Sequence, residues 1–329
     1  MSDGHPYERL LPETVLDAVE AQGFAPDGRL QPLNSFENRV YQLGLEDGTF
    51  LVAKFYRPGR WSDAQIAEEH AFVYELVAAE IGVVAPLADA TGATLFRHDE
   101  FRFALFPRRG GRAPELEGPA VAQWMGRTLG RLHAVGATRR FAHRARFDVD
   151  ELVRAPARAV LASELLPGSL ARRYQAATDE AADAIAAAWA AIAPTPLRLH
   201  GDCHPGNLLW RDAGAHVVDL DDACMGPAVQ DLWMLLSGDR RQRQLQLSTL
   251  LDGYEQLRAF DRRTLRLIEA LRGLRMIHYA GWVARRYADP IFQRTFPEFP
   301  SYAYWADETC ALEEQARLVE AERAARARA

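Results

Sequence analysis

Cysteine is scarce in the 329-residue sequence, which has only three, at positions 203, 224 and 310. Three cysteines cannot form the disulfide framework of a small secreted domain, and the low content is typical of a reducing compartment. The sequence also lacks a run of about twenty apolar residues, which a transmembrane helix requires, and its N-terminus lacks the apolar core of a signal peptide. We therefore expect a soluble cytoplasmic protein that does not enter a membrane.

The sequence also has no excess of positive charge. The formal net charge is −6, which argues against nucleic acid as a main partner. Hydrophobic residues make up 48% of the chain and charged residues 26%, and this balance is that of a folded protein rather than a disordered one. The length is sufficient for an enzyme of two lobes, and a monomer is the expected state.

The stretch that starts at His200 carries the strongest functional signal, and it reads H-G-D-C-H-P-G-N. Asp202 and Asn207 are spaced by the D-x-x-x-x-N interval of the catalytic loops of phosphoryl-transfer enzymes. At such a position Asp202 could orient an attacking hydroxyl group and accept its proton.

A β-hairpin is expected directly after this loop. Residues 208–210 and 216–220 are short apolar segments, and the residues between them are typical of a turn. If the turn is centred on Ala213, Asn207 and Asp219 face each other at the open end of the hairpin. An amide oxygen and a carboxylate held there form half of an oxygen-ligand site for Mg²⁺, which phosphates and water usually complete.

Other interpretations of this stretch are open at this point. Any single Asp or Asn could be a turn residue or a helix cap. His200, Cys203 and His204 could suggest zinc, but their spacing lacks the paired arms of known zinc sites. Cys203 could be a nucleophile, yet no partner constellation for it is evident. The combination of loop, hairpin and late aspartate favours a phosphotransferase site.

The N-terminal part is predicted to be rich in strands, because apolar and polar residues alternate over 39–45 and 49–56 around a Glu-Asp-Gly turn. The glycine-rich phosphate loop G-x-G-x-x-G is absent before these strands. Residues 34–38 take its place, so backbone N–H groups and the hydroxyl of Ser35 are the candidate contacts for ATP phosphates. A simple turn at these residues is the alternative.

Lys54 lies among apolar residues of the second predicted strand, and a buried ammonium group requires a counter-charge. The next helix, which begins with a capping box of Ser62 and Gln65, offers one. Glu69 falls on the apolar stripe of this helix, whereas Glu68 points about a quarter turn or more away. We therefore expect the Lys54–Glu69 pair that positions ATP phosphates in kinases, with Glu68 as the second choice and a purely structural ion pair as the alternative.

A Pro- and Gly-rich break over residues 107–112 follows a strand at 101–106 and marks the best lobe boundary. We expect a nucleotide-binding lobe over residues 1–106 and a mainly helical catalytic and substrate lobe over residues 107–329. Helices are predicted at 12–23, 119–135, 240–257 and 261–288, and in several pieces over 150–193.

The motif H-G-D-x-H-P-G-N, followed by V-x-D, resembles the signature of the aminoglycoside-phosphotransferase-like kinases, a branch of the protein-kinase-like fold. Residues 33–42, 54–58 and 218–233 extend the resemblance to the bacterial stress-response kinases of that family, from about residue 10 to about residue 289. The resemblance implies an α+β fold of two lobes and a cytoplasmic serine/threonine protein kinase that uses ATP and Mg²⁺ and phosphorylates itself. It also implies that Ser35 contacts ATP. The sequence departs from the protein-kinase D-F-G motif, because Leu220 and Asp221 follow Asp219.

The residues and the resemblance together predict a kinase acting on the Ser or Thr hydroxyls of a protein. Lys54 contacts the phosphates of ATP and Glu69 holds Lys54. Asn207 and Asp219 bind Mg²⁺, and Asp202 acts with Asp219 in catalysis. The first rival is a small-molecule kinase for an amino alcohol or an aminoglycoside, since it would share the same motifs. The second rival is a nucleotide-binding regulator without catalysis.

Overall fold

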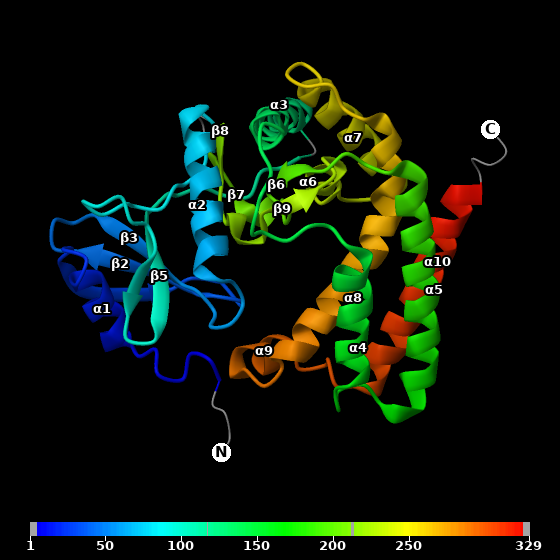
Figure 1. The fold of residues 1–329 in the computed structure, drawn as a ribbon, viewed down its shortest axis with the longest axis horizontal. Coiled ribbons are helices and arrows are strands. Elements are labelled where there is room, and N and C mark those ends of the chain that lie inside the picture. Colours follow the sequence, from blue (N-terminus) through cyan, green and yellow to red (C-terminus); the bar gives the residue numbers. More distant parts are fainter. Residues whose placement is uncertain (1–4, 117, 212–213, 325–329) are drawn as a thin grey trace. The chain divides into compact units, whose positions relative to one another are not determined.

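The computed structural model describes residues 5–116, 118–211 and 214–324 (Figure 1). The chain forms two compact units that alternate along the sequence. The first contains the residues up to Ala145, together with Arg198–Cys224 and Met234–Ala259. The second contains Arg146–Leu197, Met225–Trp233 and the residues from Phe260 onwards. All of the predicted site residues belong to the first unit.

A five-stranded antiparallel sheet forms the N-terminal part of the first unit, with the strand order β1–β2–β3–β5–β4. The strands are β1 (Pro26–Pro32), β2 (Arg39–Leu45), β3 (Phe50–Phe55), β4 (Phe96–His98) and β5 (Phe101–Pro107). Phe55 on β3 stacks on Phe103 on β5, with their ring centroids 5.1 Å apart. Helix α1 (Pro12–Glu20) buries Val15 and Val19 in the same core. The central strand β3, which carries Lys54, is therefore fixed by neighbours on both edges.

The predicted strands and first helix are confirmed in this part. Strands β2 and β3 pair antiparallel with Val40 opposite Lys54. The helix predicted over 12–23 is α1, which ends at Glu20 before a turn that reaches Gly23 with φ +83°. Strand β1 was not predicted, because most of its residues are exposed and no alternation of apolar and polar residues marks it.

Helix α2 (Asp63–Ala78) begins with the predicted capping box. The Gln65 N–H donates to the Ser62 hydroxyl at 3.2 Å, and the Ser62 N–H donates to the Gln65 side chain at 2.8 Å. Glu69 lies on the buried face of the helix with Ile66, and only 3% of Glu69 is exposed. Helix α2 therefore presents a carboxylate to the residues on which it packs.

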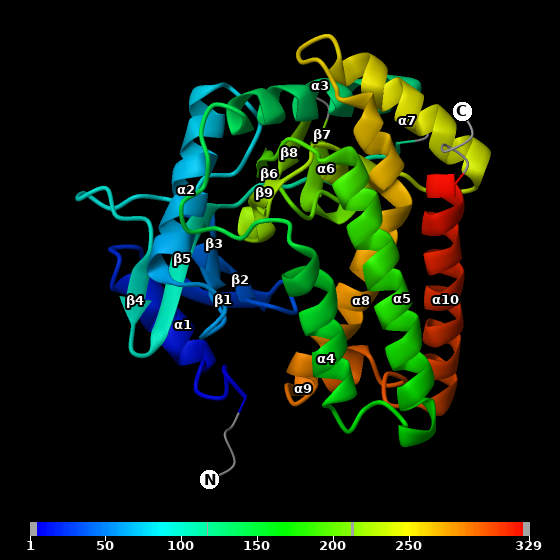
Figure 2. The same cartoon turned by 45° about the vertical axis from the view of Figure 1, so that its right-hand side comes forward.

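The rest of the first unit contains two long helices and the predicted hairpin. These are α3 (Pro119–Gly136), α7 (Arg240–Tyr254), β7 (Leu208–Arg211) and β8 (Gly214–Val217). Helices α3 and α7 lie side by side in both views (Figures 1 and 2). A Cβ added to Gly126 would lie 1.9 Å from the Leu250 carbonyl oxygen, and one added to Gly253 would lie 2.0 Å from the Gln123 carbonyl oxygen. Glycine is therefore required for this close helix contact.

The second unit is helical. Its longer helices are α4 (Ala155–Leu161), α5 (Gly168–Ile192), α8 (Ile268–Arg286) and α10 (Tyr302–Ala324), and its shorter ones are η1 (Asp150–Arg154), α6 (Val229–Trp233), η4 (Arg262–Leu267) and α9 (Pro290–Thr295). Figure 2 shows α10 beside α5, where Tyr174 and Trp305 meet with ring centroids 5.3 Å apart. Within the described residues, none of the helices combines the length and apolar character needed to cross a membrane.

Candidate active site

The loop after strand β6 (Leu197–Leu199) is held by a close backbone contact at Gly201. Gly201 has φ +88°, and a Cβ added to it would lie 2.1 Å from the carbonyl oxygen of Asp222. Only glycine combines this conformation with this approach. The contact fixes the loop against the short helix η3 (Leu220–Asp222), so that Asp202 lies beside the aspartates that follow strand β8.

His200 connects the loop to the end of strand β8. Its side chain is fully buried. The Asp202 N–H donates to its Nδ1 at 3.3 Å, and its Nε2 lies 2.9 Å from the Val218 carbonyl oxygen. Because Nδ1 accepts and Nε2 faces an acceptor, the imidazole is assigned as the Nε2–H tautomer. This histidine therefore fixes the backbone at Asp202 and does not have the geometry of a zinc ligand shared with its neighbours.

Asn207 closes the same loop from the other side. Its Nδ2 donates to the Asp202 carbonyl oxygen at 3.0 Å, and its own carbonyl oxygen accepts from the Val218 N–H at 3.0 Å. The amide nitrogen is thus used within the protein, which leaves the amide oxygen as the group that could ligate a cation. Among the described residues there is no cluster of three or more His, Cys, Asp and Glu side chains that could bind a metal.

The hairpin is confirmed, but its predicted register is wrong by one residue. Leu208 pairs with Val217, and Arg211 pairs with Gly214. Asn207 therefore lies opposite Val218 and not opposite Asp219. The turn itself, with Ala213 at its predicted centre, lies outside the described residues. A shift of one residue reverses the face of every side chain in a strand.

Asp219 is placed in the site by its backbone conformation and not by the pairing of the hairpin. It has left-handed backbone angles of φ 59° and ψ 64°. This conformation is uncommon for a residue other than glycine and ends the strand direction of β8. The chain then turns into η3. The Asp219 side chain is 50% exposed and its Oδ1 lies 2.8 Å from the Lys54 ammonium. Strain of this kind concentrates at functional sites.

Lys54 pairs with two aspartates after strand β8. Besides Asp219, the Oδ1 of Asp221 lies 3.1 Å from its ammonium, and the lysine side chain is only 8% exposed. Burial alone would lower the pKa of Lys54, but the charges of Asp219, Asp221 and Glu69 outweigh it and hold this pKa well above its usual value. Lys54 is therefore a fixed cation in the site.

Asp221 is the most completely enclosed carboxylate of the site, with 3% of its side chain exposed. Its Oδ2 accepts from Asn38 Nδ2 at 3.2 Å and forms an ion pair with Arg60. Arg60 also reaches the Asp222 carboxylate at 2.5 Å. Burial would raise the pKa of Asp221, but Lys54, Arg60 and an arginine at position 144 hold it well below its usual range. Asp221 therefore stays ionised although it is buried.

The two glutamates of helix α2 have separate tasks. Glu68 accepts three consecutive backbone N–H groups, from Ala142 at 2.5 Å, His143 at 2.8 Å and Arg144 at 2.8 Å. Glu68 is thus committed to this loop and is not the lysine partner. Glu69 points about 100° away from Glu68 into the buried cluster, and burial raises the pKa of its carboxyl to about 7, a shift that the charge of Lys54 opposes.

The predicted Lys54–Glu69 pair is not a direct contact between the described residues, although the charge of Glu69 raises the pKa of Lys54 and the charge of Lys54 lowers that of Glu69. Within the described residues, the carboxylates that lie within 4.0 Å of the Lys54 ammonium belong to Asp219 and Asp221. The ion-pair partner of Glu69 is Arg144, at 3.8 Å.

Two further predicted site residues are partly exposed. Ser35 lies half-buried in the irregular segment between β1 and β2, which the hydrogen bond from Leu33 N–H to the Val40 carbonyl closes at 2.8 Å. The Asp202 side chain is 27% exposed, and one of its oxygens lies 3.5 Å from His204 Nε2. Asp202 is thus accessible to a second reactant.

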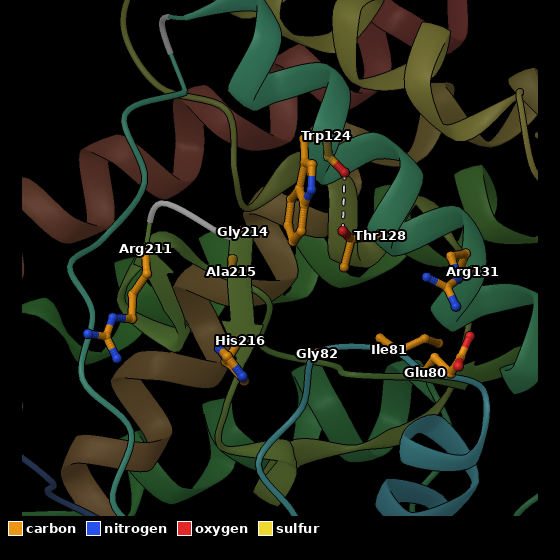
Figure 3. A pocket seen from close by; sticks show the side chains of 10 residues that line it. All are labelled: Glu80, Ile81, Gly82, Trp124, Thr128, Arg131, Arg211, Gly214, Ala215 and His216. Carbon is orange, nitrogen blue, oxygen red and sulfur yellow. Dashed lines mark hydrogen bonds between the residues drawn. The ribbon is translucent and has the colours of Figure 1, made fainter.

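A cavity of about 570 Å³ lies between the hairpin, helix α3 and residues 80–82 (Figure 3). Helix α3 contributes Trp124 and Thr128 to its wall, and strand β8 contributes His216. Its edge at Gly82 meets β8 closely, since a Cβ on Gly82 would lie 2.7 Å from the Ala215 carbonyl oxygen. This wall supports the hairpin on the side of residues 80–82.

Several residues that hold the site together were not predicted from the sequence. These are Asn38, Arg60 and Arg144, together with the bridging role of His200. Asn38 and Arg60 contact Asp221 across more than 160 positions of sequence, a separation at which no local pattern predicts a contact. Asn38 lay within the resembling segment, which was a usable signal, whereas nothing local distinguished Arg144 from its exposed basic neighbours.

Comparisons with known proteins identify the family of this chain. A model of the phosphotransferase enzyme family matches residues 29–268. The chain is 45% identical over 314 residues to "Stress response kinase A" of Escherichia coli (strain K12), covering 95% of each chain. It is 44% identical over 313 residues to "Serine/threonine protein kinase RdoA" of Salmonella typhimurium (strain LT2), covering 95% of this chain and 94% of that protein.

Solved structures show the same fold at lower identity. A microcompartment-associated aminopropanol kinase superposes with a TM-score of 0.71 at 18% identity, covering 92% of this chain and 98% of that one. An amicoumacin kinase in complex with AMP-PNP, Ca²⁺ and Ami gives a TM-score of 0.68 at 18% identity, covering 90% of this chain and 94% of that one. The predicted α+β, protein-kinase-like fold is confirmed, with an antiparallel N-terminal sheet and a mostly helical C-terminal part. The chain belongs to the phosphotransferase enzyme family and is a homologue of the stress response kinases.

Proposed function

We propose that the protein is a serine/threonine protein kinase that transfers the γ-phosphoryl group of ATP, with Mg²⁺, to a hydroxyl of a protein substrate and to itself. The observation that carries the proposal is that Lys54, Asp219 and the Asp202–Asn207 loop, which are far apart in sequence, converge in one compact unit. The family and the name of the 44% identical relative support the choice of reaction and acceptor.

The residues present fit a magnesium–nucleotide complex. The Asn207 amide oxygen and the half-exposed Asp219 carboxylate are hard oxygen donors, which Mg²⁺ prefers, and two protein ligands are typical when phosphates complete the coordination. Lys54 is a buried cation next to Asp219 and is suited to bind phosphate oxygens. When bound, the metal ion would neutralise phosphate charge that develops during transfer.

Asp202 is the proposed catalytic base. Its side chain is partly exposed, and its backbone is fixed at the N–H by His200 and at the carbonyl by Asn207. A carboxylate fixed in this way can accept the hydroxyl proton while the oxygen attacks the phosphorus in line. Ser35 is proposed to contact the phosphates from the segment between β1 and β2, and Glu69 to support Lys54 from helix α2.

We further propose a nucleotide-binding lobe over residues 1–106 and a catalytic and substrate lobe over residues 107–329. The strands β1–β5 lie in the first range, apart from the last residue of β5, and the loop with Asp202 lies in the second. A cytoplasmic location and a monomeric state complete the proposal, and the low cysteine content of three in 329 residues supports the location.

A small-molecule kinase is the competing function, because the solved structures of similar fold include an amicoumacin kinase and an aminopropanol kinase. To separate the two, purified protein is mixed with labelled ATP, Mg²⁺, a generic Ser/Thr-containing protein and a panel of amino alcohols and aminoglycosides. Label on serine or threonine of a protein is expected. Label on a small molecule contradicts the protein substrate, and nucleotide binding without transfer contradicts catalysis.

A further inference from the structure

We propose that Arg144 is a positioning residue of the phosphotransferase site, which holds helix α2 and the segment 221–223 in one arrangement and so sets the surroundings of Lys54. The inference rests on the proposed function and deepens it. It starts from the position of Arg144 in the loop after α3, a part of the chain with no motif of its own.

The Arg144 side chain is fully buried, with 0% of it exposed. Its Nε donates to the Ala223 carbonyl oxygen at 2.9 Å, and one Nη donates to the Asp221 carbonyl oxygen. The other Nη lies 3.8 Å from Glu69 Oε2. A buried guanidinium group is costly unless its charge is balanced, and the carboxylates of Glu69 and Asp221 both contribute negative charge next to it. The planar fork of arginine is suited to reach three such groups at once.

The backbone of Arg144 is tied to the same helix that carries Glu69. Glu68 accepts the N–H groups of Ala142, His143 and Arg144, and Gln65 Nε2 donates to the His143 carbonyl oxygen at 3.0 Å. Helix α2 and this loop therefore behave as one body. The Arg144 side chain is the link from that body to the segment that follows Asp219.

The indole of Trp61 covers the arginine. The guanidinium carbon lies 4.2 Å from the centre of this ring, and Arg60, which pairs with Asp221, lies over the same ring at 5.0 Å. Stacking on an indole stabilises a guanidinium group and excludes water from it. Trp61 thus keeps both arginines of the cluster in fixed planes next to Asp221.

The charge of Glu69 depends on this arrangement. The groups that face it are Lys54 and Tyr56 at the end of the sheet, Asp219 and Asp221 after strand β8, and Arg144 from the loop, while His70 is its neighbour on α2. Burial raises the pKa of Glu69, and the two cations lower it. If Glu69 must be ionised to support Lys54, activity falls at acidic pH with a midpoint set by Glu69. Loss of Arg144 then moves this midpoint to higher pH.

The test compares kcat, the KM for ATP and their pH dependence between pH 5.5 and 9 in the wild type and three variants. Arg144→Met removes the charge. Arg144→Lys keeps the charge but cannot reach three groups. The matched control is Arg140→Met, which removes an exposed arginine of the same loop. Thermal unfolding and circular dichroism report whether each variant is folded.

The expected result for Arg144→Met is a kcat lower by about 100-fold, the size of effect that a misplaced reacting geometry produces. The pH at which its activity has fallen by half on the acidic side is expected to rise by about one pH unit or more. Arg144→Lys should have a midpoint close to that of the wild type, because it keeps the charge, but a lower kcat. Arg140→Met should match the wild type in both kcat and midpoint. A folded Arg144→Met protein with the wild-type kcat and midpoint overturns the inference.

If Arg144→Met does not fold, the variants Arg144→Lys and Glu69→Gln test the inference in its place. Glu69→Gln should abolish the fall of activity at acidic pH, which we call the acidic limb, because glutamine does not titrate. Arg144→Lys should lower kcat by about tenfold. Wild-type values in Arg144→Lys, or an acidic limb that persists in Glu69→Gln, overturn the inference. A wild-type protein that transfers no phosphate to any acceptor contradicts the proposed function instead, and the inference with it.

Discussion

Replacing Asp221 by asparagine removes the charge at the centre of the buried cluster while keeping its shape. The Asp221 carboxylate is 3% exposed and forms ion pairs with Lys54 at 3.1 Å and with Arg60. Asparagine can still accept a hydrogen bond, but it leaves two buried cations with less negative charge around them. Breaking a buried ion pair by removing one partner costs about 3 to 5 kcal/mol. Because Asp219 and Asp222 still face these cations, we expect the lower end, a loss of about 3 kcal/mol in the free energy of unfolding.

The matched control is Asp222→Asn. Asp222 is the adjacent aspartate and pairs with the same Arg60, but its side chain is 46% exposed. Solvent screens exposed ion pairs, so its loss should cost no more than about 1 kcal/mol. Both variants are compared with the wild type by urea denaturation at pH 7.5, followed by tryptophan fluorescence.

The pH dependence gives an independent check on the same variant. The pKa of Asp221 is held below its usual range in the folded protein. Its stabilisation is therefore complete above the pKa of an unfolded aspartate, about 4, and it is lost as the pH falls towards the folded value. The contribution of the Asp221 charge itself should therefore shrink below about pH 4. Between pH 5 and 8 the difference also changes with the ionisation of Glu69, because the charge of Asp221 raises the pKa of that residue. Equal stability of Asp221→Asn and the wild type at pH 7.5, or an equal loss in Asp222→Asn, would refute the reasoning.

Two further changes test the metal ligand and the support of the hairpin. Asn207→Ala removes the proposed amide ligand and should raise the Mg²⁺ concentration needed for half-maximal activity by about 10- to 100-fold; an unchanged Mg²⁺ titration would exclude Asn207 as a ligand. Gly82→Ala places a Cβ 2.7 Å from the Ala215 carbonyl oxygen and should cost about 1 to 3 kcal/mol in the free energy of unfolding. Its control is Gly168→Ala, where a Cβ meets nothing within 4 Å; equal stability of the two variants would contradict the proposed packing.

Much of the fold could be predicted from the sequence because its signals are local. The capping box of Ser62 and Gln65 specifies the start of α2 within four residues, and the helical period then places Glu69 on the buried face. The alternation of apolar and polar residues likewise predicted β2 and β3 with Lys54 between them. Each of these predictions required only neighbouring residues.

The details of the site were harder to predict, for two physical reasons. The register of a hairpin depends on whether its turn is centred on a residue or between two, and a change of one position moved the partner of Asn207 from Asp219 to Val218. The ion pairs of Lys54 and Arg60 join segments more than 160 residues apart. The direct partners of Lys54 are Asp219 and Asp221 and not Glu69. This depends on tertiary packing, which the periodicity of apolar residues in the sequence does not predict.

Single-turnover transfer by Asp202→Asn tests the central claim most directly. The protein is saturated with labelled ATP and Mg²⁺, a Ser/Thr-containing acceptor is added, and label on the acceptor is followed over time. The claim predicts a folded variant that binds nucleotide like the wild type but transfers phosphate about 1,000-fold more slowly or worse, because the amide of asparagine cannot accept the hydroxyl proton as a carboxylate does. A folded variant that transfers phosphate within about tenfold of the wild-type rate would contradict it.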